Sequence, residues 1–246
     1  MGTKHLTIVA ALVGALLGPR AAAQGTFAGM VTYKVTSPEG KTGVLRYYQL
    51  GARLRQEVEA DGQNMATITD GTTGDMISLI PERKQYFVMN LRQVAGALGP
   101  MAREMEGGKQ KEAPDFSKLK VTATGRRDTI AGIACEHYLF KSTEAKDHPP
   151  MDICGATGMG FMGSGGQGAS LMPSTAALLN ATNPELARLA RQGFFPLKLT
   201  MAEKEGGKQM VLEATAVDRH RPDAALFAPP PDYTKFTMPV LPSTKP

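Results

Sequence analysis

The sequence predicts an α+β protein that is mainly antiparallel β, with a curved, open half-barrel sheet and short helices covering its concave face. Three observations support this fold class. Between Thr26 and Met89, short runs alternate apolar and polar residues, which is the period of a half-buried strand. Turn signals such as Asp61-Gly62 and Asp70-Gly71 separate these runs at intervals of about 8–12 residues, as in a meander. Amphipathic helical periods follow the meander.

The first residues have the form of a secretory signal peptide, which we place at residues 1–23. Lys4 and His5 give a basic start, Leu6 to Leu17 is apolar, and Ala21-Ala22-Ala23 offers a cleavage site of small residues. A buried N-terminal helix is the alternative. We therefore expect a periplasmic or secreted protein, cleaved near Ala23. No later segment is apolar enough to cross a bilayer, so we expect a soluble mature chain that does not span the membrane.

Composition limits the partners that the chain could bind. Residues 24–236 suit a single β-rich domain, and residues 237–246 read as a flexible, Pro-rich tail. The formal charge of +5 is mild, and no stripe of Lys and Arg is interleaved with aromatic residues. Nucleic acid is therefore not an expected partner. Methionine is frequent, with 14 residues, and it suits either an adaptable lining or ordinary core filling.

Two segments carry the helical period that the cover requires. In Asn90 to Glu106, apolar residues recur at steps of three and four, and Gly99-Pro100 interrupts them. The second segment runs from Pro184 to Gln192, with Asn183 as its N-cap and Pro184 at the first helical position. A sheet with one apolar face must bury it, and these helices are the available cover.

The rest of the chain reads as further strands joined by polar loops. We expect strands at Leu119 to Arg127 and Ala134 to Ser142, and a final hairpin with arms at Leu197 to Glu203 and Gln209 to Val217. The Gly-rich segment from Met151 to Met172 lacks the Gly-Lys-Ser/Thr ending of a phosphate loop. We interpret it as a flexible, weakly apolar loop over an opening.

Cys135 and Cys154 are the two cysteines, and in an oxidising compartment two cysteines usually pair. We therefore expect a disulfide between them. A buried free thiol at Cys135 is one alternative. The other is a soft-metal site at Cys154, with His148, Met151, Met159 and Met162 within reach in the sequence. Their spacing matches no compact ligand motif, so we expect no metal and no cofactor.

Nothing in the sequence indicates catalysis. On an alternating strand, His137 points away from Glu136 and Tyr138, and His220 lies between two arginines. Neither histidine has a recognisable Ser or Cys nucleophile. We expect that the protein is not an enzyme.

Several motifs resemble the DUF4412 family of uncharacterised exported bacterial proteins. They are Phe27 to Val35, Gly51 to Glu57, Ile80 to Tyr86 and Ile130 to Tyr138, with the Gly193 to Leu199 run resembling the entry to the family's final hairpin. The family is similar to the LolA/LppX-like superfamily. That resemblance implies an open half-barrel with an apolar concave face under helices, where better-known relatives hold acyl chains of lipoproteins or lipids. The chain departs from its relatives in having no tryptophan. The family offers no catalytic residue to carry over.

The leading hypothesis is thus a non-enzymatic protein that binds a lipid, a lipoprotein acyl chain or another apolar ligand in the half-barrel cavity. The alternative is a structural or interaction module that contacts an envelope protein and has no ligand cavity. The residues predicted to line the cavity are Phe27, Met30, Tyr33, Leu45, Tyr47, Met65, Met76, Leu79, Phe87, Leu98 and Met101. Their assignment to one face depends on strand register, because a slip of one residue reverses it.

Overall fold

The computed structural model describes residues 27–90, 118–143, 150–160, 183–202 and 207–237. These residues form a 12-stranded sheet. The strands are β1 (Gly29–Thr36), β2 (Thr42–Leu50), β3 (Arg53–Ala60), β4 (Gln63–Asp70), β5 (Asp75–Ile80), β6 (Gln85–Asn90), β7 (Leu119–Ile130), β8 (Ile133–Ser142), β9 (Met151–Ala156), β10 (Phe195–Ala202), β11 (Gln209–Asp218) and β12 (Thr234–Lys235). One α-helix, α3 (Pro184–Arg191), and two short 3-10 turns, η1 (Pro81–Arg83) and η4 (Ala224–Phe227), complete the described part.

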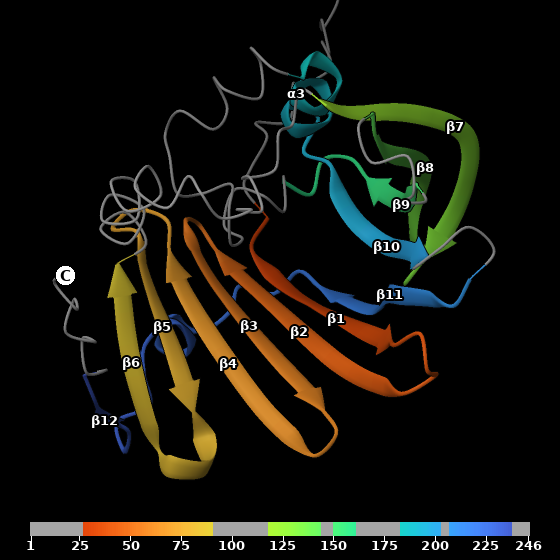
Figure 1. Cartoon of the computed structure of the whole chain (residues 1–246). Helices are drawn as coiled ribbons and strands as arrows, with labels where there is room; N and C mark the ends of the chain where they lie inside the picture. Colours follow the sequence, from red (N-terminus) through yellow and green to blue (C-terminus); the bar gives the residue numbers. More distant parts are fainter. Residues whose placement is uncertain (1–26, 91–117, 144–149, 161–182, 203–206, 238–246) are drawn as a thin grey trace, which may run out of the picture.

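The sheet is open and strongly bent. Its strand order is β12-β6-β5-β4-β3-β2-β1-β11-β10-β9-β8-β7, and β12 with β6 is the one parallel pair among the described strands. Strands β1–β6 form one wall and β7–β10 the other, with β11 between them (Figure 1). The expected open, mainly antiparallel sheet of an α+β protein is therefore confirmed.

Short turns set the register of the meander. Asp61 and Gly62, between β3 and β4, both have positive φ, at 51° and 75°. Ala131 and Gly132, between β7 and β8, repeat this pattern with φ of 50° and 78°. Two consecutive residues with positive φ make the turn whose twist matches that of the flanking strands. Each turn therefore fixes which residues face each other across its hairpin.

Strand alternation gives the wall β1–β6 two distinct faces. We call the face that carries Val31, Tyr47 and Leu54 the inner face, because these side chains are buried in the hollow of the sheet. The opposite, outer face carries Ile68 and Leu79, which pack against Phe227 of η4 and its neighbours. The C-terminal segment, dark blue in Figure 1, passes behind this wall.

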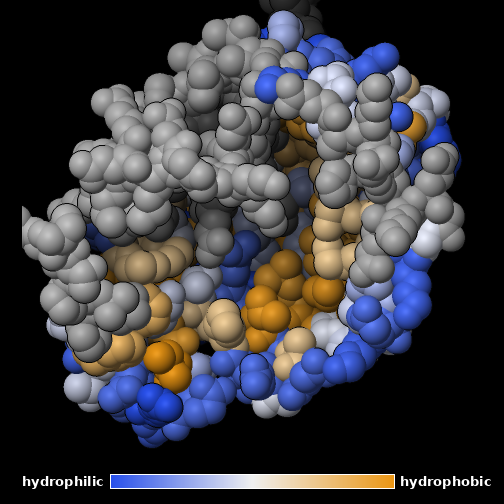
Figure 2. Space-filling model, in the orientation of Figure 1, coloured by the Kyte–Doolittle hydropathy of each residue, from blue (hydrophilic) through white to orange (hydrophobic). Residues whose placement is uncertain are grey.

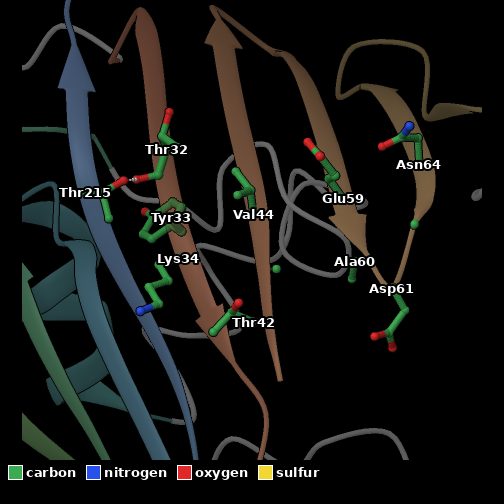
Figure 3. A pocket seen from close by; sticks show the side chains of 12 residues that line it. Thr32, Tyr33, Lys34, Thr42, Val44, Glu59, Ala60, Asp61, Asn64 and Thr215 are labelled. Carbon is green, nitrogen blue, oxygen red and sulfur yellow. Dashed lines mark hydrogen bonds between the residues drawn. The ribbon is translucent and has the colours of Figure 1, made fainter. Parts of the chain in front are cut away.

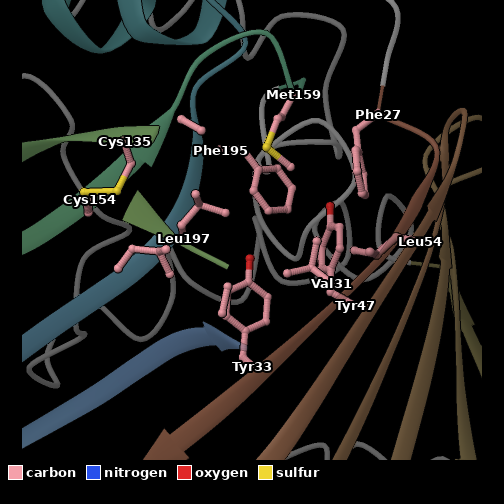
Figure 4. Packing of buried hydrophobic residues seen from close by; sticks show 13 residues of the cluster. Phe27, Val31, Tyr33, Tyr47, Leu54, Cys135, Cys154, Met159, Phe195 and Leu197 are labelled. Carbon is pink, nitrogen blue, oxygen red and sulfur yellow. A yellow bond between two sulfur atoms is a disulfide. The ribbon is translucent and has the colours of Figure 1, made fainter. Parts of the chain in front are cut away.

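Aromatic residues fill the angle between the two walls. Phe195 of β10 is fully buried, and its ring centroid lies 5.4 Å from that of Phe27 and 5.7 Å from that of Tyr47. The Tyr33 hydroxyl donates a hydrogen bond of 2.8 Å to the carbonyl oxygen of Pro196, which links β1 directly to β10. Met159 also joins this cluster (Figure 4). The inner face is therefore solidly packed at this angle.

Helix α3 confirms the helix predicted from Pro184. The Asn183 side chain accepts a hydrogen bond of 3.0 Å from the backbone nitrogen of Leu186, which caps the first turn. Leu186 and Leu189 are buried in a cluster with Tyr138 and Phe140 of β8. The helix expected within residues 90–106 lies almost wholly outside the described residues, so a helical cover over the wall β1–β6 stays a prediction.

The expected disulfide is present. Cys135 and Cys154 are bonded, with their Cα atoms 5.4 Å apart, and they join the neighbouring strands β8 and β9. Neither cysteine is therefore a free thiol or a thiolate ligand in this state.

The interpretation of Met151 onward as a loop was wrong for its first residues, because Met151–Ala156 is strand β9. Gly155 obscured the strand in the sequence. A Cβ atom at this position would collide with the Phe194 ring. The glycine therefore lets an aromatic side chain pack directly on the strand. Residues 161–172 of the predicted loop lie outside the described residues.

We expect the disulfide to contribute to stability by restricting the unfolded chain. Its cysteines are 19 residues apart, and closing a loop of that length is worth about 3 kcal/mol on the chain-entropy scale. Urea unfolding of the Cys135→Ala/Cys154→Ala variant should show that loss, and the wild-type protein equilibrated with a reductant should lose a similar amount. An unfolding midpoint that does not respond to the reductant would contradict this expectation.

Alkaline pH should also destabilise the fold, through the two tyrosines of the packed angle. Burial raises the pKa of Tyr33 and of Tyr47 well above their ordinary value of 10.0, and Tyr47 beside Tyr33 adds to the shift of Tyr33. Above pH 10 the unfolded chain releases these protons while the folded chain keeps them. The free energy of unfolding should therefore fall by about 1.4 kcal/mol per pH unit for each tyrosine, until the folded-state pKa is passed.

Denaturant unfolding at several pH values above 10 measures that slope. Tyr33→Phe and Tyr47→Phe should each make it less steep, because each removes one buried group whose pKa is raised. Tyrosinate absorbance of the folded protein gives an independent reading. If all 6 tyrosines ionise together near pH 10 in the folded state, burial does not protect this pair.

Candidate functional site

The inner face of β1–β6 carries no charged side chain. In each of these strands, the residues in register with Val31, Tyr47 and Leu54 are apolar, Gly, Ser, Thr, Gln or Tyr. Every charged residue of the six strands lies on the outer face. These residues are Lys34, Arg46, Arg53, Arg55, Glu57, Glu59, Asp70 and Asp75.

The charges on the outer face are used by contacts there. Arg55 pairs with Glu57 at 2.7 Å and also donates a hydrogen bond to the Leu226 carbonyl oxygen. Arg53 lies over the Phe227 ring, 5.5 Å from its centroid. These contacts hold the C-terminal segment on the outer face, so the two faces of one wall have separate chemistries.

Seven of the predicted lining residues share the inner face, but they fall into two groups. Phe27, Tyr33 and Tyr47 belong to the packed angle and are at most 5% exposed. They are therefore core residues that pack against other side chains. The other four lie on the inner face of β2, β4, β5 and β6, and among them Leu45 also packs against the cluster at the angle. They are Leu45, Met65, Met76 and Phe87.

The expectation that one face collects all the predicted residues does not hold for Met30 and Leu79. Met30 pairs with Tyr48, and Leu79 pairs with Ala66 and Tyr86, all on the outer face. Leu79 is buried there with Phe227. Their hydrophobicity is explained by a second apolar layer that the sequence analysis did not foresee. Leu98 and Met101 lie outside the described residues.

Away from the packed angle, the inner face is partly open. Val58 of β3 and Met65 of β4 face each other across the strands and are 41% and 62% exposed. Leu45 stands beside Val58 on β2. Figure 2 looks into the hollow, where apolar residues gather, while hydrophilic residues form its lower and right-hand rim. The inner face of β2–β6 is therefore an uncharged surface with exposed apolar side chains, and it is the candidate site.

A second hollow, on the outer face, differs from the inner face in its charge. It spans about 710 Å³ over β1–β4 and β11, and its lining mixes apolar residues with polar and charged ones (Figure 3). The Thr215 hydroxyl donates a hydrogen bond of 3.2 Å to the Thr32 carbonyl oxygen at one side of it. Its outward side chains include Thr32, Lys34, Thr42, Val44, Glu59 and Asn64. Such a lining does not suit an acyl chain.

The structure brings together a polar cluster of Arg126, His137 and Asp152 that the sequence did not predict. His137 is 6% exposed, and its Nδ1 lies 2.6 Å from an Asp152 carboxylate oxygen and 2.6 Å from an Arg126 guanidinium nitrogen. Arg126 also pairs with Asp152. An irregularity in β7 between Ala123 and Arg127 places Arg126 opposite His137, and no period in the sequence signals it.

The contacts among Arg126, His137 and Asp152 connect neighbouring strands and do not form a catalytic arrangement. The hydroxyl nearest to it in the hydrogen-bond network, that of Thr124, donates to the backbone oxygen of His137 and not to the imidazole ring. Among the described hydrogen bonds, none brings a Ser or Cys nucleophile to His137. The cluster therefore ties β7, β8 and β9 together.

Within the parts of the chain that the structure describes, no three His, Cys, Asp or Glu side chains lie together in a way that could hold a metal ion. The same parts contain no helix with the length and hydropathy needed to cross a membrane.

Three solved structures are distantly similar in fold. An uncharacterized conserved protein from Thermus thermophilus is 11% identical, with a TM-score of 0.47, over 85% of this chain and 90% of that one. MucB in complex with MucA(peri) is 11% identical, with a TM-score of 0.42, over 86% of this chain and 57% of that one. A domain assigned as an outer membrane lipoprotein-sorting protein, from Vibrio parahaemolyticus, is 7% identical, with a TM-score of 0.30, over 84% and 90%. None is similar enough to transfer a function.

Comparison with curated proteins found no match. The profile of the family described as "Domain of unknown function (DUF4412)" matches residues 27–233, from the start of the packed angle to the turn before β12. This match confirms the resemblance seen in the sequence motifs, and because it covers most of the chain, the protein belongs to the DUF4412 family.

Proposed function

We propose that this protein is a non-enzymatic, exported binding protein that holds an apolar ligand, such as a lipid or a lipoprotein acyl chain, against the inner face of β2–β6. The observation that carries the proposal is the separation of charge between the two faces of this wall. A surface that needs only to be soluble gains from charged side chains, yet all eight charged residues of β1–β6 are outside.

The solvent exposure of apolar side chains on the inner face also supports the proposed binding of an apolar ligand. Val58 and Met65 are the large apolar side chains of the inner face with the greatest exposure, and they form a cross-strand pair. Contiguous exposed apolar surface rimmed by polar residues is typical of binding sites. Covering it with an acyl chain would remove apolar area from water without burying a charge. Met65 also has the flexibility to adapt to chains of different shape.

A second candidate function is interaction with an envelope protein, and the edge of the sheet favours it. Strand β12 pairs with β6 only at Gln85 and Tyr86. No described strand continues along that edge at Val88 and Met89, and Val88 is 36% exposed. An extended segment of a partner could add a strand there. This candidate uses the edge of the wall, whereas the ligand proposal uses its inner face.

A charge placed on the inner face should weaken binding of an apolar ligand. We expect Met65→Asp to reduce affinity for a fluorescent methyl ester of a twelve-carbon fatty acid by about tenfold or more, which equals about 1.4 kcal/mol. The carboxylate would have to lose water beneath the ligand, with no counter-charge on that face. Met65 is mostly exposed in the free protein, so the substitution should leave the fold intact.

Asn64→Asp is the matched control, because it adds the same charge one residue away on the outer face. It should leave the affinity for the ester unchanged. Equal losses in the two variants would mean that net charge, not the inner face, controls binding. If the wild-type protein binds no ester probe and native mass spectrometry finds no lipid on protein from an envelope fraction, the interaction at the β6 edge becomes the function to test.

A further inference from the structure

A row of three polar side chains crosses the inner face at its centre. Register places Gln56 of β3 beside Thr67 of β4, and Thr67 beside Ser78 of β5. The row begins at Tyr47 of β2 and ends at Phe87 of β6. All three polar residues are half-buried. The inner face is thus not uniformly apolar: besides Gln49, Gln63, Thr69 and Gln85, it carries this continuous row of amide and hydroxyl groups across three adjacent strands.

Apolar side chains flank this band on both sides. On one side lie Leu45, Val58 and Met65, which face each other across β2, β3 and β4. On the other side, Leu54 and Met76 are buried next to the band on β3 and β5, with the buried Thr69 of β4 between them. A chain that lies along the strands would therefore cross from apolar surface over polar groups and back to apolar surface.

The three side chains make no hydrogen bond to any other part of the chain that the structure describes. The contrast is Gln49, on the same face, which accepts a hydrogen bond of 3.0 Å from the Tyr47 hydroxyl and donates to the Gly51 carbonyl oxygen. A ligand that covers Gln56, Thr67 and Ser78 would strip their water. Unless it supplies a partner, that loss opposes binding.

The partner must accept hydrogen bonds and carry no charge. The Gln56 amide and the two hydroxyls can all donate, so a carbonyl oxygen is a suitable acceptor. A carboxylate or phosphate would also accept, but the inner face of β1–β6 offers it no cation, because Arg55 and the other charged residues are on the outer face. An ammonium group would find no anion there for the same reason.

Resting on the proposed function, we propose that Gln56, Thr67 and Ser78 form a recognition band for the neutral carbonyl of a fatty acyl ester. The ester group lies over the band, with its acyl chain along the apolar row on one side. This makes the protein selective for esterified acyl chains over free fatty acids and over hydrocarbon chains that lack a carbonyl.

Three probes with the same chain length separate the possibilities. They are 1-monolauroyl glycerol, which has the ester carbonyl, 1-O-dodecyl glycerol, which replaces the ester by an ether, and laurate, which is charged. We expect the ester to bind the full-length mature protein about tenfold more tightly than the ether, measured by isothermal titration calorimetry below the critical micelle concentrations, and laurate to bind more weakly than the ester. Equal affinities for ester and ether would overturn the recognition band and leave the proposed function standing. Binding of none of the three would overturn both.

Variants test the band itself. Thr67→Val and Ser78→Ala remove the hydroxyls with little change of shape, and the double variant should bring the ester-to-ether affinity ratio down to about one by weakening the ester alone. Thr42→Val on the outer face is the control and should leave the ratio unchanged. Because the ratio is taken within each variant, a small loss of folded protein does not alter it. If the double variant keeps the wild-type ratio of ester to ether affinity, the hydroxyls of the band do not bind the ester carbonyl.

Discussion

The contact of Phe195 with Phe27 and Tyr47 holds the two walls of the open sheet together. The first and last strands in the sheet order, β12 and β7, are not paired with each other, so backbone pairing does not close the sheet. The curvature of the sheet is therefore maintained by the side chains packed in the angle and by the hydrogen bond from Tyr33 to Pro196. The strands on either side can then keep their inner faces directed at one hollow.

The same packing divides the hollow into a filled part and an open part. Near β1 and β10 the aromatic cluster fills the inner face and forms a buried core there. Farther along, at β3 and β4, Val58 and Met65 are left exposed. A ligand site next to a rigid core is well positioned, because the strands that carry it cannot move independently of that core. The packed core and the proposed ligand surface thus use different stretches of the same strands.

The outer face explains why the inner face can be free of charge. Ile68 and Leu79 make that face apolar at its centre, and Leu226 and Phe227 cover it. Arg53 and Arg55 then attach the covering segment through their side chains. The chain's charges stabilise this layer, and the inner face remains neutral.

The local periods of the chain determined most of its strands and the helix that starts at Pro184, because alternation, turn residues and an N-cap are short-range signals. Seven of the predicted lining residues shared a face for that reason. The disulfide followed from the presence of only two cysteines in a chain expected to be exported. Only the tertiary structure decided that Met30 and Leu79 belong to a second layer, since hydrophobicity in one strand does not reveal which face a distant segment will cover. It also decided that β1 pairs with β11, that Gly155 belongs to a strand under Phe194, and that Gln56, Thr67 and Ser78 align. The pairing of β1 with β11 and the packing of Phe194 on Gly155 depend on contacts between residues far apart in the chain, which no local pattern encodes.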